Sequence, residues 1–437
     1  MNKRFIILFL FGFFFFSCSK EEDFKSIPDP NTMVLDSAFV ISKSLYLWNA
    51  GIKEQKDFNP LQFKSPIELI LEFRKYSPKN DVGIPIDQWS FAIDKESWNA
   101  ILNGNASDFG CGFRFKDTND LRISAVQQNS FAGKNGLYRG LQVLSINNIK
   151  ATTTNIDLIS EEFYNSANLS IDYLDKKTQT IKTILITKTP YIVEPIMTNK
   201  YFNVDNKKVG YINISTFINS VNDKLPLIFD DFKANAIDAL IIDLRYNGGG
   251  LTSVMEDIAN MLIPSSAVGK IMYTTKHNTD YEMFNSHTFF SESNQRLNLK
   301  TVYFIVSHNT ASSSEMLINA LKPYVNTVLV GQESQGKLVG MYTAPFHNYI
   351  LAPVSFKTYN VNDESLEKNG FLPNFYAEDD VANDFDENEG CINIVLYHYK
   401  NNSFPPSKIR NRKGLKFKEE VLLFHDDLPF AVKEKIF

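Results

Sequence analysis

Apolar positions are spaced differently in three parts of this chain, and the first part is helical in pattern. From about residue 31 to residue 103 they recur at helical intervals, most regularly over residues 33–48 and 65–76. The second stretch opens with Ser65-Pro66-Ile67-Glu68, which combines a serine N-cap, a proline at the first helical position and a capping-box glutamate. This part of the chain is therefore predicted to be a helical N-terminal region.

The second part, residues 104–190, has short apolar runs separated by glycine and asparagine. Runs of this length between turn residues are typical of β-strands. The predicted strands are residues 121–126, 141–146 and 181–187. A β-rich domain is therefore expected here.

In the third part, residues 191–437, strand and helix patterns alternate. Buried strands are predicted at residues 209–214, 239–244, 302–306 and 327–330, and helices at residues 254–262 and 313–321. Such alternation predicts a sheet with crossover helices, followed here by a C-terminal extension. Ligands of these sheets bind beyond the carboxyl ends of the strands, so the residues that follow each strand are the candidates for chemistry.

Composition narrows the possible partners. The 437 residues include 45 lysines and arginines and 50 aspartates and glutamates, a formal charge of −5 that argues against a nucleic-acid partner. The histidines show no paired spacing typical of zinc ligands, so neither a metal nor another cofactor is predicted. Cys111 and Cys391 are too few and too far apart to indicate a disulfide framework, and we expect no bridge between them.

The N-terminus has the pattern of an export signal. Two basic residues and an apolar run, Phe5–Phe16, lead directly to Ser17-Cys18, and the run is too short to span a bilayer comfortably. A small residue before a cysteine at this place resembles the lipobox of bacterial lipoproteins. The resemblance implies that residues 1–17 are removed and that Cys18 is lipidated. Residues 18–30 then form a tether to a membrane of the cell envelope, expected to be the outer membrane.

Two alternatives remain for this segment. Ordinary secretion would leave Cys18 without a role. The run Ser19–Asp23 is similar to the acidic signal that sends some Bacteroidetes lipoproteins to the cell surface, but it is equally typical of a solvated tether.

Two strand ends carry unusual residues. The strand 239–244 is followed by Arg245-Tyr246-Asn247-Gly248-Gly249-Gly250, and glycines can adopt positive φ and turn their N–H groups toward a ligand. The strand 302–306 is followed by a loop and then by Ser312-Ser313-Ser314-Glu315, which opens a helix. Free N–H donors and the positive end of the helix dipole favour an oxyanion there. Taken alone, the first pattern indicates only a tight turn and the second only a capping box.

A third strand end adds a lysine. The strand 327–330 is followed by Gly331-Gln332-Glu333-Ser334-Gln335-Gly336-Lys337. With the glycine turn and the Ser-x-x-Glu helix start, this segment resembles peptidase family S41, the carboxyl-terminal processing peptidases. The resemblance implies a Ser-Lys site with Ser312 as nucleophile, Lys337 as general base, Glu315 as the residue that orients the lysine, and an oxyanion hole from Gly249 or Gly248 and the backbone of Ser313. A lysine can act as a base when burial lowers its pKa from about 10.4.

The resemblance extends to segments on both sides. Asp87-Gln88-Trp89-Ser90-Phe91 is similar to the end of the N-terminal region in Bacteroidetes members, and Gly370–Asn374 is similar to a late turn of the family. Many members carry a glutamine four residues after the lysine, where this chain has Met341. The segment Phe109–Phe113 resembles the loop of a PDZ domain, which would offer backbone N–H groups to the C-terminal carboxylate of a peptide through Phe109, Gly110, Cys111, Gly112 and Phe113. The alternative is a β-domain that only packs on the core.

The resemblance thus implies an α/β core similar to the crotonase and Clp-peptidase fold, with a PDZ-like domain and a helical N-terminal region. The implied function is a cofactor-independent serine endopeptidase that cleaves extended or C-terminally captured polypeptides at the cell envelope. A binding protein on the same scaffold remains open, because the interphotoreceptor retinoid-binding repeats resemble this core without acting as peptidases. A scaffold that only presents the PDZ domain is a third reading. His308 lies near the serine without a suitably placed acid and is expected to be a solvated loop residue.

Overall fold

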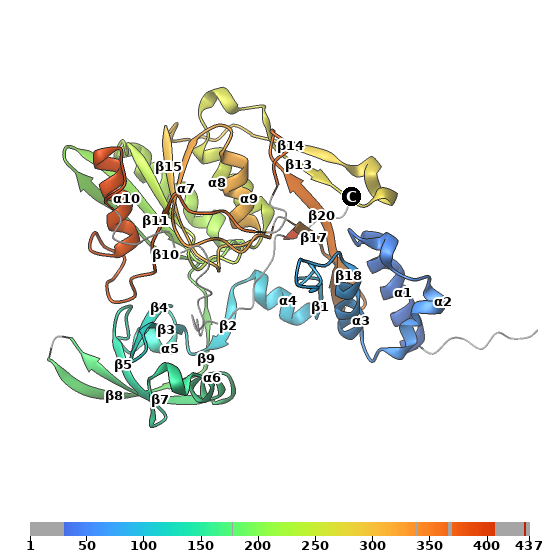
Figure 1. Ribbon diagram of the computed structural model, residues 1–437, viewed down its shortest axis with the longest axis horizontal. Coiled ribbons are helices and arrows are strands. Elements are labelled where there is room, and N and C mark those ends of the chain that lie inside the picture. Colours follow the sequence, from blue (N-terminus) through green and yellow to red (C-terminus); the bar gives the residue numbers. More distant parts are fainter. Residues whose placement is uncertain (1–29, 177, 338, 366–368, 407–431, 434–437) are drawn as a thin grey trace, which may run out of the picture.

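The computed structural model describes residues 30–176, 178–337, 339–365, 369–406 and 432–433. Figure 1 shows three parts: an α/β core, a β-rich unit beneath it, and N-terminal helices beside a second sheet. The predicted signal segment and Cys18 lie outside the described residues. Within those residues, no helix combines the length and apolar character needed to cross a membrane.

The core is built on a six-stranded sheet. Its order is β10 (Ile196–Val204), β11 (Lys207–Ile214), β12 (Ala239–Asp243), β15 (Thr301–Val306), β16 (Asn326–Gly331) and β21 (Phe375–Tyr376). Only the β10–β11 pair is antiparallel, so the remaining strands direct their carboxyl ends to one edge. All five residues of β12 are buried, as expected for a parallel strand covered on both faces. The four strands predicted in this part of the chain are confirmed.

Helices cover both faces of this sheet. The helices α7 (Ser220–Ala234), α8 (Thr252–Leu262) and α9 (Ser313–Leu321) share one apolar core with the sheet, while α10 (Gly390–Asn401) packs on the opposite face. The helices predicted at 254–262 and 313–321 are confirmed as α8 and α9. Single 3-10 turns complete the chain: η1 (Asn49–Gly51), η2 (Pro60–Gln62), η3 (Arg74–Tyr76), η4 (Thr153–Asn155), η5 (Ser265–Ala267) and η6 (Thr279–Phe284).

The N-terminal helices pack against a second sheet system. One sheet has the order β14 (Ser286–Phe289), β13 (Ile271–Lys276), β20 (Val354–Tyr359), β17 (Val339–Tyr342) and β22 (Val432–Lys433). The other has the order β1 (Phe91–Asp94), β19 (Tyr349–Ala352) and β18 (Ala344–Phe346). The helices are α1 (Pro30–Leu45), α2 (Gln55–Phe58) and α3 (Pro66–Phe73). Phe39 and Phe73 share a core with Met341 and Phe356, so this region is folded onto the strands that follow Lys337.

The start of α3 differs in detail from the prediction. The Ser65 side chain accepts the Glu68 N–H as expected. The Glu68 carboxylate, however, accepts the N–H of Lys64 at 2.9 Å, one residue earlier than in a regular capping box.

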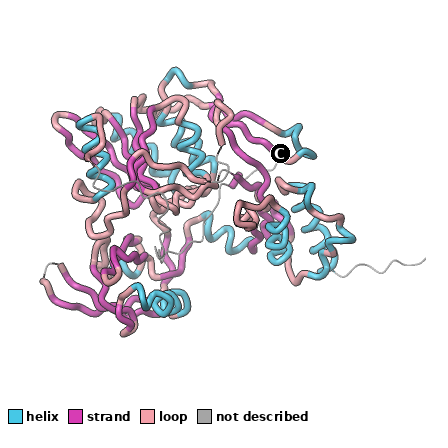
Figure 2. The backbone as a smooth tube through the Cα atoms, in the orientation of Figure 1, coloured by secondary structure: helices cyan, strands magenta, loops and turns pink. Residues whose placement is uncertain are grey.

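The β-rich unit has its own core and joins the rest of the chain through a two-stranded stem, β2 (Asn105–Asp108) and β9 (Thr189–Ile192). Its sheet comprises β3 (Cys111–Asp117), β4 (Asp120–Val126), β5 (Gln142–Ile146), β6 (Ile149–Lys150), β7 (Asn168–Asp175) and β8 (Thr180–Thr187), with β3 at one edge. Its helices are α5 (Phe131–Lys134) and α6 (Ile156–Asn165), and α4 (Lys95–Leu102) precedes the stem. Figure 2 shows the strand-rich character of this unit against the helical N-terminal region.

Candidate active site

Ser312 is the first residue of the site and lies at the start of α9. It is fully buried and has φ 60° and ψ −120°, a backbone conformation that is uncommon outside glycine. Such strain persists only where the surroundings fix it, and it is found preferentially at functional sites. The Ser312 N–H donates to Glu315 Oε2 at 3.0 Å, and the two residues form a capping box as well. A cap alone, however, does not require the strained backbone.

The glycine turn after β12 faces this serine. Gly249 has φ 109°, and a Cβ placed on it would lie 2.9 Å from the Ser312 Cβ and 3.1 Å from the Ser313 nitrogen. Hydrogen bonds join the two segments: the Ala311 N–H and the Ser314 Oγ both donate to the Asn247 carbonyl, at 3.2 and 3.1 Å. The two unusual strand ends therefore meet, as the topology of a parallel sheet predicts.

The candidate oxyanion donors are not equivalent. The Gly249 N–H donates to Asn247 Oδ1 at 2.8 Å and is thus already engaged. In the part of the chain that the structure describes, the main-chain N–H groups of Gly248 and Ser313 have no acceptor. Of the donors predicted from the sequence, these two are the ones available to a developing negative charge.

Lys337 is fully buried. Removal from water lowers its pKa well below the ordinary value; the nearby Asp87 and Glu315 charges act in the opposite direction, and Arg74 adds to the lowering. Its Nζ lies 5.4 Å from the centroid of the Trp89 ring. A lowered pKa increases the fraction of the neutral amine, and the neutral amine can accept a proton.

Glu315 connects the serine and the lysine through their main chains. Its Oε2 accepts from the N–H of Lys337 at 2.7 Å and from that of Ser312, while its Oε1 accepts from Gly336 N at 2.7 Å and from Ser334 Oγ at 2.6 Å. Burial raises the pKa of this carboxyl, and the four hydrogen bonds oppose the rise. Glu315 thus fixes the backbone that carries Lys337.

The late turn Gly370–Asn374 supports the same segment. The Phe371 N–H donates to Ser334 Oγ at 2.7 Å, and the Ser334 N–H donates to the Phe371 carbonyl at 3.2 Å. A Cβ on Gly370 would lie 1.9 Å from the Ser334 carbonyl oxygen, so only glycine allows this approach. The turn therefore holds the segment that precedes Lys337.

One contribution was not predicted: the segment Asp87–Ser90 lies against Lys337. Asp87 is fully buried, and its carboxylate accepts from the Tyr46 hydroxyl at 3.0 Å and from the Trp89 and Ser90 N–H groups at 2.9 Å. The sequence motif marked this segment as the end of the N-terminal region. Nothing in the sequence of this segment indicates that it lies near Lys337.

A second unpredicted feature is a buried ionic network between the β-rich unit and the core. The Asp379 carboxylate contacts Arg139 and Arg245 at 2.6 Å each and Arg114 at 3.5 Å. Arg245 also contacts Glu389 at 2.7 Å and leads directly into the glycine turn. These charges come from five separate segments, and sequence spacing does not relate them.

The predicted peptide-binding loop lies in the β-rich unit, away from the core (Figure 1). The side chains of Phe109, Cys111 and Phe113 are buried in the unit's own core, and the Gly110 N–H donates to Asp108 Oδ1 at 2.6 Å. A ligand could therefore contact only the main chain here, along the edge strand β3, which begins at Cys111 and includes Gly112. Cys111 and Cys391 are buried in different apolar cores.

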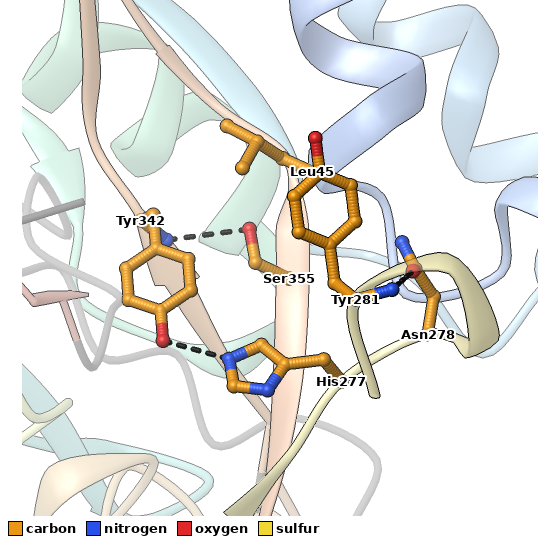
Figure 3. A pocket seen from close by; sticks show the side chains of 6 residues that line it. All are labelled: Leu45, His277, Asn278, Tyr281, Tyr342 and Ser355. Atoms are coloured by element: carbon orange, nitrogen blue, oxygen red, sulfur yellow. Dashed lines mark hydrogen bonds between the residues drawn. The ribbon is translucent and has the colours of Figure 1, made fainter. Parts of the chain in front are cut away.

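A small pocket near α1 is separate from these residues (Figure 3). It is lined by Leu45, His277, Asn278, Tyr281, Tyr342 and Ser355. His277 Nε2 lies 2.8 Å from the Tyr342 hydroxyl, and Asn278 Nδ2 donates to the carbonyls of Ser44 and Tyr46. The Asn278 bonds attach the β13–β14 hairpin to the N-terminal region, and the His277 contact attaches it to β17. Among the described side chains, no group of three histidines, cysteines, aspartates or glutamates could hold a metal ion.

The α/β core holds a strained serine at a helix start, a glycine turn that faces it and a fully buried lysine. These are components of the Ser-Lys class of hydrolases. Comparison with known proteins specifies the family. Residues 208–377 match the family model of peptidase family S41. The part of the core that carries Ser312, Glu315 and Lys337 is therefore similar to this family.

Relatives agree with this assignment. A carboxyl-terminal-processing protease of Synechocystis sp. is 26% identical over 223 residues, 51% of this chain and 50% of the relative. One of the same name from Picosynechococcus sp. is 28% identical over 173 residues, 39% of each chain. The chain therefore spans half or less of the length of these curated relatives.

Solved structures show the same fold. A Bacteroides fragilis protein classed with the S41 proteases superposes with a TM-score of 0.67 at 22% identity, covering 84% of this chain and 97% of that one. The photosystem II D1 C-terminal processing protease gives a TM-score of 0.50 at 15% identity, with 80% and 94% covered. The predicted fold class is confirmed.

Proposed function

We propose that this protein is a serine endopeptidase of the Ser-Lys type. The observation that carries the proposal is the pairing of a strained, buried serine with a fully buried lysine whose pKa is lowered by desolvation. Neither feature is needed by a protein that only binds ligands. Burial of a lysine that could be replaced by an apolar residue is unfavourable for folding, so a catalytic role explains it best.

The proposed reaction uses Lys337 as both base and acid. The neutral amine takes the proton of the Ser312 hydroxyl while the serine oxygen attacks the peptide carbonyl. The N–H groups of Gly248 and Ser313 stabilise the negative charge on the carbonyl oxygen. The Lys337 ammonium then protonates the leaving amine, and an ester on Ser312 remains. Lys337 then takes a proton from water as the water oxygen attacks this ester, and it returns that proton to the Ser312 oxygen as the new carboxylate leaves.

Extended polypeptides are the proposed substrates. The strand β17 begins two residues after Lys337, and its outer edge pairs in parallel with β22, Met341 opposite Val432 and Tyr342 opposite Lys433. An edge that accepts one extended segment supports binding of another by strand addition. We further propose that the edge of β3, with the loop Phe109–Phe113 at its start, captures the C-terminal end of the substrate.

The test is labelling by a serine-directed activity probe. We expect the wild type to be labelled and Ser312→Ala to be unlabelled. Ser42→Ala, which alters a buried serine of α1 away from this helix start, is the matched control and should retain labelling. A wild type that binds peptides but is labelled no more than Ser312→Ala would favour the binding-protein alternative and contradict the peptidase.

We also propose that Cys18 anchors the protein to an envelope membrane. The support is the sequence pattern alone: an apolar run that ends at Ser17-Cys18, followed by a polar tether. One acyl chain gives only marginal binding, so the several chains of bacterial lipoproteins are required. Cys18→Ala should abolish incorporation of labelled fatty acid and release the protein from the membrane fraction. Unchanged incorporation would contradict the anchor.

A further inference from the structure

The N-terminal region supplies part of the surroundings of Lys337, and this observation leads to a role for one of its residues. The Trp89 ring lies 5.4 Å from the lysine Nζ, so the amine is located at the turn formed by residues 87–90. Asp87 is two residues away in sequence and fully buried. A buried carboxylate beside a buried amine acts on it more strongly than it would in water, because little solvent screens the charge.

The Asp87 carboxylate is held in place from several sides. Its Oδ2 accepts from the hydroxyls of Tyr46 and Ser90, at 3.0 and 2.5 Å, and its Oδ1 accepts from two main-chain N–H groups. The Ser90 hydroxyl oxygen also accepts the Val354 N–H at 2.8 Å, which attaches the turn to β20. These bonds come from Tyr46, which follows α1, from the turn itself and from the second sheet. The position of the charge is therefore fixed by three elements.

The other charges around Lys337 differ in their role. Glu315 acts on the lysine charge too, but its hydrogen bonds hold the main-chain N–H groups of Gly336 and Lys337. Arg74, whose Nε donates to the Ser90 carbonyl at 2.7 Å, opposes protonation of the lysine. Four residues after Lys337 the chain provides only the buried, apolar Met341. Of the two carboxylates, Asp87 has the larger effect on the lysine charge.

We infer that Asp87 is a positioning residue for the reaction: its carboxylate sets the proton affinity of Lys337 and holds the amine at the 87–90 turn. This inference rests on the proposed Ser-Lys function. Without Asp87, desolvation and the Arg74 charge would act on the lysine with less opposition. The amine would then lose its proton at lower pH and be a weaker base.

The test follows the Lys337 titration directly. In a Ser312→Ala background, the side-chain resonance of Lys337 is observed by NMR as a function of pH and assigned by its loss in Lys337→Arg. Asp87→Asn should move the midpoint to lower pH by about one unit or more, as expected for removal of a neighbouring charge. In the protein with Ser312 intact, the rising limb of kcat/KM should move in the same direction, and its plateau should fall about tenfold.

Two further variants keep the test decisive. Asp108→Asn is the matched control, because Asp108 is also buried and also accepts from a tyrosine hydroxyl and a main-chain N–H, yet lies in the stem of the β-rich unit. It should leave the Lys337 midpoint unchanged. Arg74→Gln should move the midpoint to higher pH, and it decides the question alone if Asp87→Asn does not fold.

The outcomes separate this inference from the proposed function. A folded Asp87→Asn protein with an unchanged Lys337 midpoint overturns the inference, even if its activity is lost. If Asp87→Asn does not fold, an unchanged midpoint in Arg74→Gln overturns it. A wild type without serine-directed labelling or turnover instead contradicts the peptidase, and the NMR titration still reports whether Asp87 acts on Lys337.

Discussion

Replacing Gly249 by alanine tests whether the glycine turn positions Ser312. Gly249 has φ 109°, a region that residues with a Cβ rarely adopt. The added Cβ would lie 2.9 Å from the Ser312 Cβ and 3.0 Å from the Ala311 carbonyl oxygen. Both separations are shorter than ordinary van der Waals contact, so the serine and the turn have to move apart.

The structure gives the expected size of the effect. The strained backbone should lower the free energy of unfolding by about 1–3 kcal/mol. Displacement of a catalytic group by about 1 Å can reduce the rate about 100-fold, and relief of these contacts requires a shift of several tenths of an ångström. We therefore expect kcat to fall between about 10- and 100-fold, with KM nearly unchanged, because the change moves the reacting oxygen rather than the substrate contacts.

Gly269→Ala is the control for backbone strain. Gly269 has φ 75°, and no atom lies within 4 Å of the position of its added Cβ. This variant should lose stability to a similar extent and keep peptide turnover within about threefold of the wild type, as expected away from the reacting groups. Steady-state kinetics and thermal unfolding on both variants are the assay. Equal turnover in Gly249→Ala and Gly269→Ala would refute the placement of the glycine turn at the reacting serine.

Three further predictions concern the same site, and a fourth concerns the proposed capture of substrate at β3. Lys337→Arg keeps the charge but cannot release a proton near neutral pH, so turnover should fall more than about 100-fold while peptide binding persists, and near wild-type turnover would exclude the Ser-Lys mechanism. Glu315→Gln places an NH2 group where the carboxylate now accepts four hydrogen bonds, so it should lower both turnover and melting temperature. An unchanged melting temperature would contradict these four bonds. Because burial lowers the Lys337 pKa, the unfolded chain binds the proton more readily than the folded chain at pH values between the folded-state pKa and 10.5. The free energy of unfolding should therefore rise with pH in that window. Lys337→Met should remove this rise and be more stable than the wild type at pH 7, and urea unfolding measured across pH will check both outcomes. Amidation of a substrate's C-terminus should reduce its turnover, and equal turnover of acid and amide peptides would remove the proposed capture at β3.

The sequence predicted the parts of the site that depend on local order. Strand, turn and helix patterns placed Ser312 and Lys337 after neighbouring parallel strands, whose carboxyl ends must meet at one edge. The resemblance to peptidase family S41 implied that the glycine turn faces Ser312, and a Cβ on Gly249 would lie 2.9 Å from the Ser312 Cβ. Local pattern suffices here because each residue directly follows a strand whose place in the sheet it fixes.

The remaining features depend on tertiary packing. Nothing in the spacing of Asp87 or Trp89 relates them to Lys337, about 250 positions away, because the contact is made by folding α1 and α3 onto β17 and β20. The choice among the oxyanion donors rests on the Asn247 side chain, whose rotamer sequence cannot specify. Similarly, the Asp379 network joins arginines of two units, and charge spacing along the chain gives no sign of it.

The segment that matches the family model does not include all of the residues around Lys337. The match begins at residue 208 and includes the serine, the glutamate, the lysine and the glycine turn. Trp89 and Asp87 lie outside it, yet one approaches the amine and the other acts on its charge. Since a lysine loses its proton near neutral pH only when it is withdrawn from water, the residues that cover Lys337 belong to the chemistry as much as those that react. The N-terminal region is therefore part of the proposed active site, and the proposed catalytic unit extends beyond the segment that matches the family model.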